Sequence, residues 1–282
     1  MQPLAVVGPD AQAVVDQLAS QLAETGAVGT VSVTESLASA VTPASDGSAD
    51  ENDAVGPPGS THHYSLSADG WVGSGTDRSL TDALDALAVA CEYGLVAGRT
   101  QRRLPTVVLG EASVPDTARV LVRERRAEDV DTETLCDELE TVPAYETLES
   151  LVADIKREAD ETFSGAIATF TGRVRAREDS QDEPTRYLEF EQYDPVAKER
   201  LATLREELES RDGILSVRLH HRTGRVVAGE DIVFVVILAG HRGEAFRAVE
   251  DGINRLKAEV PLFKKEVTTT ETFWAHQHDP SR

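Results

Sequence analysis

The chain has 282 residues, 40% of them hydrophobic and 5% aromatic, so it is long enough for two domains with aliphatic cores. Lys and Arg number 28 against 50 Asp and Glu, and the net charge of -22 argues against a general nucleic-acid binder, which needs a basic face. Because arginine far outnumbers lysine, this acidity predicts a halophilic cytoplasmic protein. The alternative is an acidic surface that recruits a basic partner.

The N-terminus and the cysteines indicate the same compartment. The first residues, MQPLAVVGPD, contain neither a basic region nor a long apolar run, and no stretch reaches the roughly 18 apolar residues of a membrane span. Cys91 and Cys136 lack metal-ligand spacing and need not pair. We therefore expect a protein of the reducing cytoplasm, without a membrane segment or a bound metal.

Strand and helix patterns alternate in residues 1–140. Pro3 to Gly8 predicts a buried strand, residues 10–26 have apolar positions at helical spacing, and VGTVSVTE predicts a second strand. This order is typical of a βαβ unit, so we expect a doubly wound α/β domain. Residues 39–61 are small, acidic and rich in Pro and Gly, and predict a mobile surface loop.

Four further elements are expected after this loop. HHYSLSADGWVGSG predicts a hairpin, and a helix follows near Leu80 to Ala90. YGLVAG and PTVVLG predict two more buried strands.

The loop VGPDAQAVVDQL lies between the first strand and the first helix, where a nucleotide-binding P-loop would lie. The positions of the second glycine, the lysine and the hydroxyl residue of that motif are occupied by Ala13, Val14 and Val15. Asp10 adds negative charge where phosphates would bind. We therefore expect an ordinary turn without nucleotide binding.

In residues 145–282 the order of the expected strands and helices is different. A helix from about Tyr145 to Asp160 either closes the first domain or opens the second. SGAIATFTGRVRA and TRYLEFEQY predict strands, and PVAKERLATLREELES predicts a helix. GILSVRLHHRTGRVVAGEDIVFVVILAGH predicts two strands joined by a turn, and GEAFRAVEDGINRLKAEV a helix that Pro261 stops. Because strands and helices do not alternate regularly, we expect an α+β fold.

Two basic motifs could bind anions. On a strand, Arg173, Arg175 and Arg177 would share one face, and they would repel each other unless an anion met them. A solvated edge strand is the alternative. His241 and Arg242 follow an apolar strand where a helix begins, and helix N-termini favour phosphate. An ordinary loop is the alternative there.

Three of the five lysines of the chain lie within nine residues, in KAEVPLFKKE. The expected apolar face of the preceding helix consists of Phe246, Val249, Ile253 and Leu256. Lys257 falls at the rim of this face, where partial burial would depress the pKa of its amine, and the segment after the proline would hold Lys264 and Lys265. Because the chain uses arginine elsewhere, the cluster favours a site for titratable amines over ordinary surface lysines.

The remaining histidines favour simpler interpretations. His276 and His278 could bind a metal, but a polar tail is preferred. His62 and His63 are interpreted as a loop pair, and His220 and His221 as a strand pair.

GAIATFTGRVR, HHRTGRVVAGEDIVFVVILAGHRGEAF and LKAEVPLFKKE together resemble the large, catalytic subunit of molybdopterin synthase, from about Phe163 to Trp274. The resemblance implies an α+β fold and a homodimer within a heterotetramer. It also implies a sulfurtransferase of molybdenum cofactor biosynthesis. Sulfur would pass from the C-terminal Gly-Gly thiocarboxylate of a ubiquitin-like carrier to cyclic pyranopterin monophosphate, forming the molybdopterin dithiolene without a metal or redox cofactor.

The same resemblance implies roles for single residues. Lys257 matches the essential lysine of the family, and we expect Lys257 and Lys264 to be catalytic. The implied substrate-binding residues are Arg173, Val174, Arg175, His241, Arg242, Lys265 and Glu266. After Trp274 the sequence AHQHDPSR departs from the family, because the expected basic residue is not evident.

The N-terminal half resembles, in topology and loop position, the GTP-binding accessory domain of molybdopterin-guanine dinucleotide biosynthesis, with the P-loop chemistry missing. Two alternatives to sulfur transfer stay open. One is a non-catalytic binding module for ubiquitin-like carriers. The other is a bifunctional cofactor-assembly protein whose N-terminal domain binds nucleotide.

A helix from about Gly243 to Lys257 would be roughly 22 Å long at about 1.5 Å per residue. His241 and Arg242 would then lie too far from Lys257 to grip one small pterin together. We therefore hypothesise a composite site in a two-fold dimer, in which this pair faces Lys257 and Lys264 of the other subunit.

Overall fold

The computed structural model describes residues 1–33, 62–67, 70–75, 78–99, 103–115, 118–160, 162–177, 179, 182–192, 194–268 and 272–275. The chain divides into two compact units, Met1–Tyr145 and Glu146–Arg282. The loop expected at residues 39–61 and the histidines His276 and His278 lie outside the described residues.

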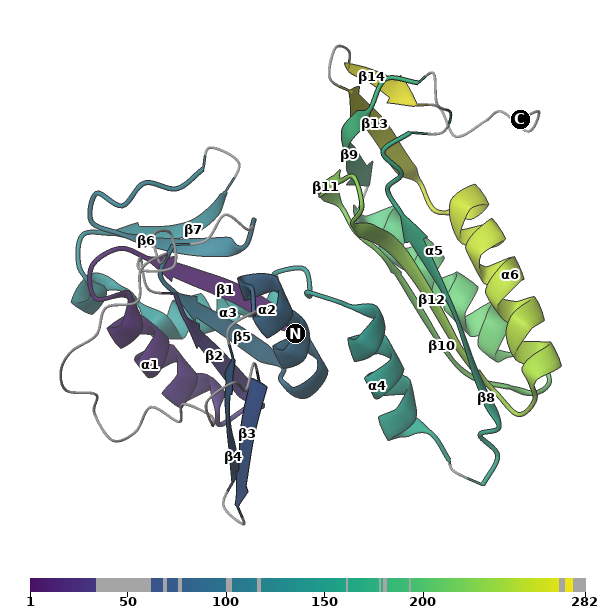
Figure 1. Ribbon diagram of the computed structural model, residues 1–282, viewed down its shortest axis with the longest axis horizontal. Helices are drawn as coiled ribbons and strands as arrows, with labels where there is room; N and C mark the ends of the chain where they lie inside the picture. Colours follow the sequence, from purple (N-terminus) through teal and green to yellow (C-terminus); the bar gives the residue numbers. More distant parts are fainter. Residues whose placement is uncertain are drawn as a thin grey trace. The chain divides into compact units, whose positions relative to one another are not determined.

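The N-terminal unit contains a parallel sheet of five strands in the order β2-β5-β1-β6-β7 (Figure 1). The strands are β1 (Gln2–Val7), β2 (Val28–Ser32), β5 (Tyr93–Ala97), β6 (Pro105–Leu109) and β7 (Arg119–Glu124). The helices are α1 (Ala11–Leu22), α2 (Leu80–Ala90), the short η2 (Ala127–Asp129) and α3 (Thr132–Glu140). The expected hairpin is present as β3 (His62–Ser67) and β4 (Gly70–Gly75).

Helices cover both faces of this sheet. Leu4, Val6 and Leu95 pack with α1 and α3 in one core, whereas Ala5 and Val96 pack with α2 in another. Because successive side chains of a strand point to opposite faces, a strand covered on both sides must be apolar throughout. The expected α/β architecture is therefore confirmed as a parallel sheet between two layers of helix.

Two elements of this unit are absent from the sequence-based expectation. β7 forms an edge of the sheet and has mixed polar and apolar residues, although its Leu121 and Val122 pack on the core. α3 begins after Asp131, whose carboxylate accepts a hydrogen bond from the backbone N–H of Thr134 at 3.1 Å. Edge strands and short helices carry weak periodicity, so neither element stands out in the sequence.

The C-terminal unit contains two sheets. The first has the order β10-β12-β8, formed by β8 (Ala166–Arg173), β10 (Ile214–His221) and β12 (Asp231–Ala239). The second has the order β11-β9-β13-β14, formed by β9 (Thr185–Gln192), β11 (Gly224–Val227), β13 (Leu262–Thr268) and β14 (Thr272–Ala275). The helices are α4 (Leu148–Glu158), α5 (Asp194–Glu209) and α6 (Arg242–Glu259).

The sheet β10-β12-β8 is the centre of this unit, with α4 on one face and α5 and α6 on the other (Figure 1). Val235 and Ile237 of the middle strand pack toward α5 and α6, and Phe234 and Val236 pack toward α4. The second sheet contributes a small core of its own, made of Val174, Leu188, Phe190 and Val226. The mixed order of elements confirms the expected α+β class.

The sequence-based prediction is wrong at three places in this unit. The segment between the two expected strands is more than a turn, because its residues Gly224–Val227 form β11 and pair with β9. β8 ends at Arg173, so Arg175 and Arg177 lie beyond the strand and do not share a strand face with it. Phe246, expected on the apolar face of α6, is 65% exposed.

The end of β1 generates a test of the N-terminal unit. Gly8 has a φ of 125°, and a Cβ atom there would lie 2.2 Å from the carbonyl oxygen of Leu109. We expect Gly8→Ala to lower the free energy of unfolding of this unit by about 3 kcal/mol, because the backbone of β1 or β6 must shift. Equilibrium unfolding of the full chain in urea measures the loss.

Gly110→Ala is the matched control. Gly110 also follows a strand of this sheet and has a positive φ of 61°, but a Cβ atom there would come no closer than 3.6 Å to a neighbour. Gly110→Ala should lower the free energy of unfolding by about 1 kcal/mol, which is the cost of a left-handed backbone at a residue with a side chain. Equal losses in the two variants would contradict the steric explanation.

Candidate active site

A groove of about 480 Å³ opens in the C-terminal unit between its two sheets and the end of α6. Apolar side chains of β8, β9, β12 and α6 form much of its wall. Its charged or titratable lining residues are Arg173, Arg175, His221, Lys257, Lys264 and Glu266. Four cationic side chains thus meet at one place in a chain whose net charge is -22.

The end of β8 brings the two arginines to the groove. Arg173 is the last residue of the strand, and its Nε lies 2.9 Å from a carboxylate oxygen of Asp231. Its guanidinium also donates a hydrogen bond to the carbonyl of Gly229. Arg175 follows two residues later and lines the same groove. Asp231 and Gly229 therefore fix the orientation of Arg173 before any ligand binds.

The last turns of α6 place Lys257. Ile253 and Leu256 are buried in the core, and the next residue, Lys257, reaches the groove. Its Nζ lies 6.0 Å from the centroid of the Phe170 ring, at the limit of a cation–π contact. The sequence predicts partial burial at this position, but Lys257 is exposed, because the core residues end one position before it.

β13 contributes Lys264 and Glu266, because alternate side chains of a strand point to the same face. Glu266 accepts a hydrogen bond from the hydroxyl of Thr185 on β9. Lys265 lies between them on β13 and is absent from the groove lining; its Nζ is 3.7 Å from a carboxylate oxygen of Glu189. The structure therefore does not bring Lys265 to the groove, and its predicted substrate contact stays a prediction.

His241 and Arg242 lie at the other end of α6. His241 is the N-cap residue, and its backbone N–H donates to a carboxylate oxygen of Glu244 at 3.2 Å. Both residues are exposed and neither lines the groove. A rise of about 1.5 Å per residue puts roughly 22 Å between Arg242 and Lys257. Val174 does not line the groove either, because it is buried in the core of the second sheet.

His221 is a groove residue that the sequence indicated only as one of a strand pair. Its ring centroid lies 4.8 Å from that of Phe190 in an edge-to-face arrangement, and its Nδ1 lies 2.7 Å from the carbonyl oxygen of Arg222. Burial lowers the pKa of His221, the bond to Arg222 opposes this shift, and the charge of Lys257 lowers the pKa further. Its position two residues beyond Leu219, on the core-facing side of β10, is the signal that could have identified it.

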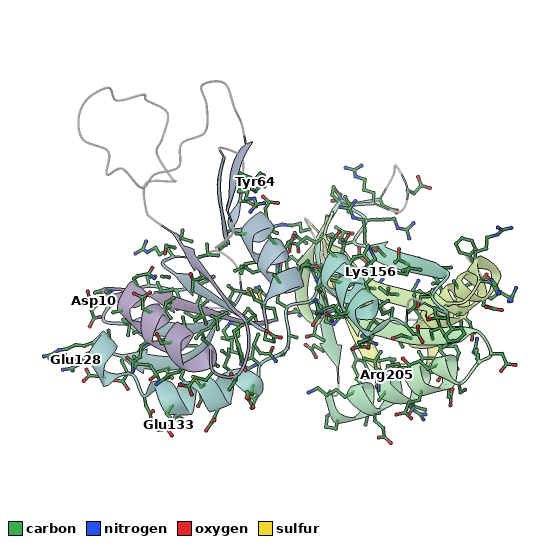
Figure 2. All side chains as sticks on the ribbon, turned by 90° about the horizontal axis from the view of Figure 1, so that it is seen from below. Asp10, Tyr64, Glu128, Glu133, Lys156 and Arg205 are labelled. Carbon is green, nitrogen blue, oxygen red and sulfur yellow. The ribbon has the colours of Figure 1, made fainter. Side chains whose placement is uncertain are left out.

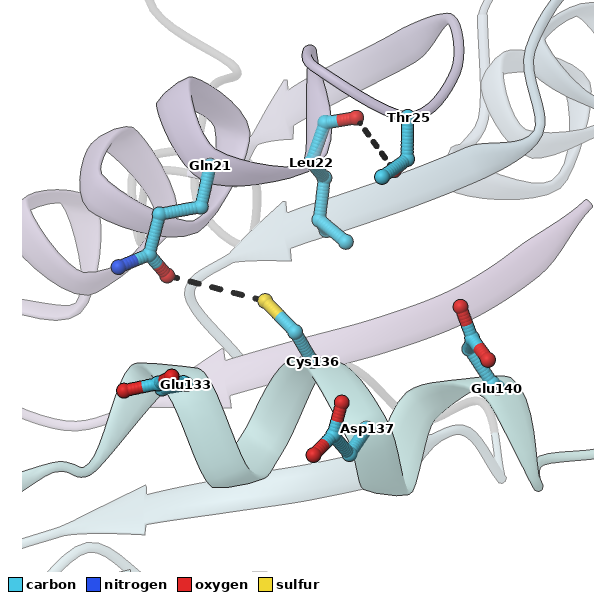
Figure 3. A pocket seen from close by; sticks show the side chains of 7 residues that line it. All are labelled: Gln21, Leu22, Thr25, Glu133, Cys136, Asp137 and Glu140. Atoms are coloured by element: carbon cyan, nitrogen blue, oxygen red, sulfur yellow. Dashed lines mark hydrogen bonds between the residues drawn. The ribbon is translucent and has the colours of Figure 1, made fainter.

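A second cavity, of about 340 Å³, lies between α1 and α3 of the N-terminal unit (Figure 3). In it the Cys136 thiol lies 3.7 Å from the side-chain oxygen of Gln21. Burial raises the pKa of Cys136, and the carboxylates of Asp137 and Glu140 raise it further. A thiol that stays protonated is a poor nucleophile and a poor metal ligand, so this cavity is not the candidate active site.

In the described parts of the chain, no group of three or more His, Cys, Asp and Glu side chains could hold a metal ion. None of the helices in these ranges has the length and the apolar composition needed to cross a membrane.

Acidic side chains such as Glu128 and Glu133 project outward from the N-terminal unit, as Figure 2 shows.

The C-terminal unit is thus an α+β domain with a groove lined by four cationic side chains. The model of the MoaE protein family matches residues 144–259. A relative from Haloferax volcanii, described as a probable molybdopterin synthase, is 48% identical over 277 residues, which cover 98% of this chain and 99% of that protein. The chain therefore belongs to the molybdopterin synthase catalytic-subunit family, whose members are enzymes of molybdenum cofactor biosynthesis.

Matches to shorter proteins cover the C-terminal unit. The molybdopterin synthase catalytic subunit of Staphylococcus aureus strain Mu50 is 34% identical over 116 residues, which cover 41% of this chain and 77% of that protein. A crystal structure of molybdopterin synthase from Staphylococcus aureus is 31% identical, with a TM-score of 0.41, and the match covers 47% of this chain and 91% of that chain.

The family match and the two sequence relatives confirm the resemblance predicted for the C-terminal half. The family match begins at residue 144, whereas the Haloferax relative aligns with nearly the whole chain. The N-terminal unit is therefore shared with that relative. None of the matches reported above identifies this unit as a nucleotide-binding domain.

Proposed function

We propose that the C-terminal unit transfers sulfur from the C-terminal Gly-Gly thiocarboxylate of a small ubiquitin-like carrier to cyclic pyranopterin monophosphate. The product is the dithiolene of molybdopterin, and the reaction takes place in the cytoplasm. The observation that carries the proposal is the convergence of Arg173, Arg175, Lys257 and Lys264 in one groove. Both reactants are anions, and membership of the family supplies the type of reaction.

In this proposal the two arginines hold the phosphate of the pterin. A guanidinium presents its N–H donors in a planar fork that matches phosphate oxygens. The contacts of Arg173 with Asp231 and Gly229 reduce the freedom that substrate binding would otherwise remove. An anion between Arg173 and Arg175 also offsets the repulsion of their like charges.

Lys257 and Lys264 act on the thiocarboxylate of the carrier. The amine of Lys257 stabilises the acyl group, or attacks the acyl carbon so that its bond to the sulfur breaks, or carries protons as sulfur moves to the pterin. Lys264, on the neighbouring β13, assists electrostatically. The exposure of Lys257 supports this role, because the flexible end of a carrier must reach the amine from outside the unit.

The complete site is composite in this proposal, with His241 and Arg242 of one subunit facing Lys257 and Lys264 of the other in a homodimer. Two such subunits and two carriers form a heterotetramer. The separation of the pair from the groove along α6 supports this arrangement. Phe246, one turn beyond Arg242, is 65% exposed, and an exposed phenylalanine beside a phosphate-binding pair suits a surface that a second subunit covers.

The N-terminal unit is proposed to be a degenerate relative of a P-loop domain with a structural or docking role. Its parallel sheet and the position of the loop after β1 support the relationship. Gly8 packs against the carbonyl of Leu109, so a side chain is excluded at this position of the loop. Asp10 has a left-handed backbone with a φ of 57° and lies at the N-terminus of α1 (Figure 2), where its charge would repel a phosphate.

Lys257→Ala tests the catalytic proposal. The variant should fold normally, because the side chain is exposed, but should form dithiolene at least about 100-fold more slowly. Lys257→Arg should also fail if the amine must titrate and should survive if only its charge matters. The assay incubates the protein with thiocarboxylated carrier and cyclic pyranopterin monophosphate, and follows dithiolene by mass spectrometry.

Lys198→Ala is the matched control, because Lys198 is an exposed helical lysine on α5 outside the groove. It should react at the wild-type rate. Near-normal product from Lys257→Ala would refute the role of this lysine. A wild-type protein that binds the carrier without transferring sulfur would favour the alternative of a non-catalytic binding module.

Subunit mixing tests the composite site. Lys257→Ala and Arg242→Ala should each be inactive alone, but a mixed dimer should regain one intact site, made of Lys257 from one chain and Arg242 from the other. Random assembly of equal amounts should restore about one quarter of the wild-type rate. If both residues served the same chain's site, the mixture would stay as inactive as its components.

A titration with GTP and magnesium tests the N-terminal unit. We expect no binding at millimolar nucleotide, because the lysine and hydroxyl of a P-loop are replaced by Val14 and Val15. Calorimetry on the full chain measures it. Saturable binding would favour the alternative of a bifunctional cofactor-assembly protein.

A further inference from the structure

His221 has a defined place in the groove, and the proposed sulfur transfer assigns it no role. The two histidines of β10 point to opposite faces of the sheet. His220 stacks on Phe234 on the face that α4 covers, with ring centroids 6.1 Å apart. His221 points to the other face and lines the groove, beside Phe190.

The hydrogen bond of Nδ1 fixes the state of the other ring nitrogen. A carbonyl oxygen can only accept, so Nδ1 of His221 carries the hydrogen that it donates to Arg222. In the neutral ring, Nε2 is then left with a lone pair. Nε2 has no partner among the described residues, and none of those residues has a fully buried side-chain nitrogen without a partner. Nε2 therefore reaches the solvent of the groove.

The surroundings keep this ring neutral. Burial lowers the pKa of His221, and the ammonium of Lys257 on α6 lowers it further against the opposing bond to Arg222. Glu266, which also lines the groove, has an opposite charge but is hydrogen-bonded by Thr185. The other titratable groups of the groove are Arg173, Arg175 and Lys264. β10 adds His220 and Arg218, which pairs with Glu158 of α4, and Arg222 follows the strand. A cationic environment of this kind disfavours a further positive charge on the imidazole.

We propose that Nε2 of His221 accepts a hydrogen bond from an N–H group of the pterin ring and so selects a nitrogen heterocycle among phosphate-bearing ligands. This inference rests on the proposed function. The arginines and lysines of the groove can only donate, and they contact any phosphate in the same way. A pterin adds ring N–H and amino donors, which need an acceptor. A site built around such a bond disfavours ligands that lack the donor.

The test is the equilibrium binding of cyclic pyranopterin monophosphate to the full chain, with inorganic phosphate as a competitor. His221→Asn keeps an amide N–H near the position of Nδ1 for the carbonyl of Arg222, and removes Nε2. We expect the Kd for the pterin to rise about threefold to tenfold, the loss of one hydrogen bond. The Kd for inorganic phosphate should stay unchanged, because phosphate uses only the cationic groups.

Two further variants keep the test decisive. His221→Gln places an amide oxygen near the position of Nε2 and should recover most of the affinity. His220→Asn is the matched control on the opposite face of the same strand and should leave both Kd values unchanged. The melting temperature of each variant shows whether it is folded.

Two outcomes would overturn the proposal. In the first, His221→Asn weakens the binding of pterin and of phosphate equally, which indicates a structural role. In the second, the pterin Kd does not change. The comparison of Kd values needs no carrier, so a wild-type protein that binds pterin but forms no dithiolene would refute the proposed function and leave the role of His221 decided.

Discussion

Burial of β12 on both faces is the constraint on which the C-terminal unit depends. Between Val233 and Ala239 the strand has no polar side chain, because α4 covers one face and α5 and α6 cover the other. β8 and β10 pair with its two edges, so the end of β8 with Arg173 and the end of β10 with His221 have fixed positions. α6 packs on the same strand and brings Lys257 to the groove. An apolar strand thus positions the polar groups of the site.

The positive charge of the groove is unusual because the rest of the chain is strongly acidic. With 50 acidic residues, a cationic side chain normally has carboxylates nearby, as Arg255 has Glu207 and Glu259. Lys257 forms no ion pair with any described residue. A local excess of positive charge is electrostatically unfavourable unless an anion completes it. The groove is therefore better explained as half of an interaction with a ligand than as a source of stability.

The sequence predicts the helices and strands whose residue pattern is local. It fails for elements that form only because they pair with a strand distant in the chain. The long helix α6 and the strand β12 are visible as periodic or wholly apolar segments. β11 has four residues and exists because it pairs with β9, more than thirty residues earlier in the chain. Of the lysine cluster, the structure places Lys257 and Lys264 in the groove lining, and their catalytic role stays a prediction. Lys265 lies outside this lining, because alternate side chains of β13 point to opposite faces, and the sequence alone does not show which of the two adjacent lysines faces the groove.

α6 makes the distance between its two ends a fixed property of the unit. Ala245, Ala248 and Gly252 are residues of α6 that are buried where the helix meets the sheet. A Cβ atom on Gly252 would lie 3.2 Å from Val235 of β12. Small residues at this contact let the helix lie close along the sheet, and close packing resists bending. The histidine and arginine at its start cannot approach Lys257 by local rearrangement. A ligand that uses both ends would therefore have to meet two copies of the helix, which is the physical ground for the composite site proposed above.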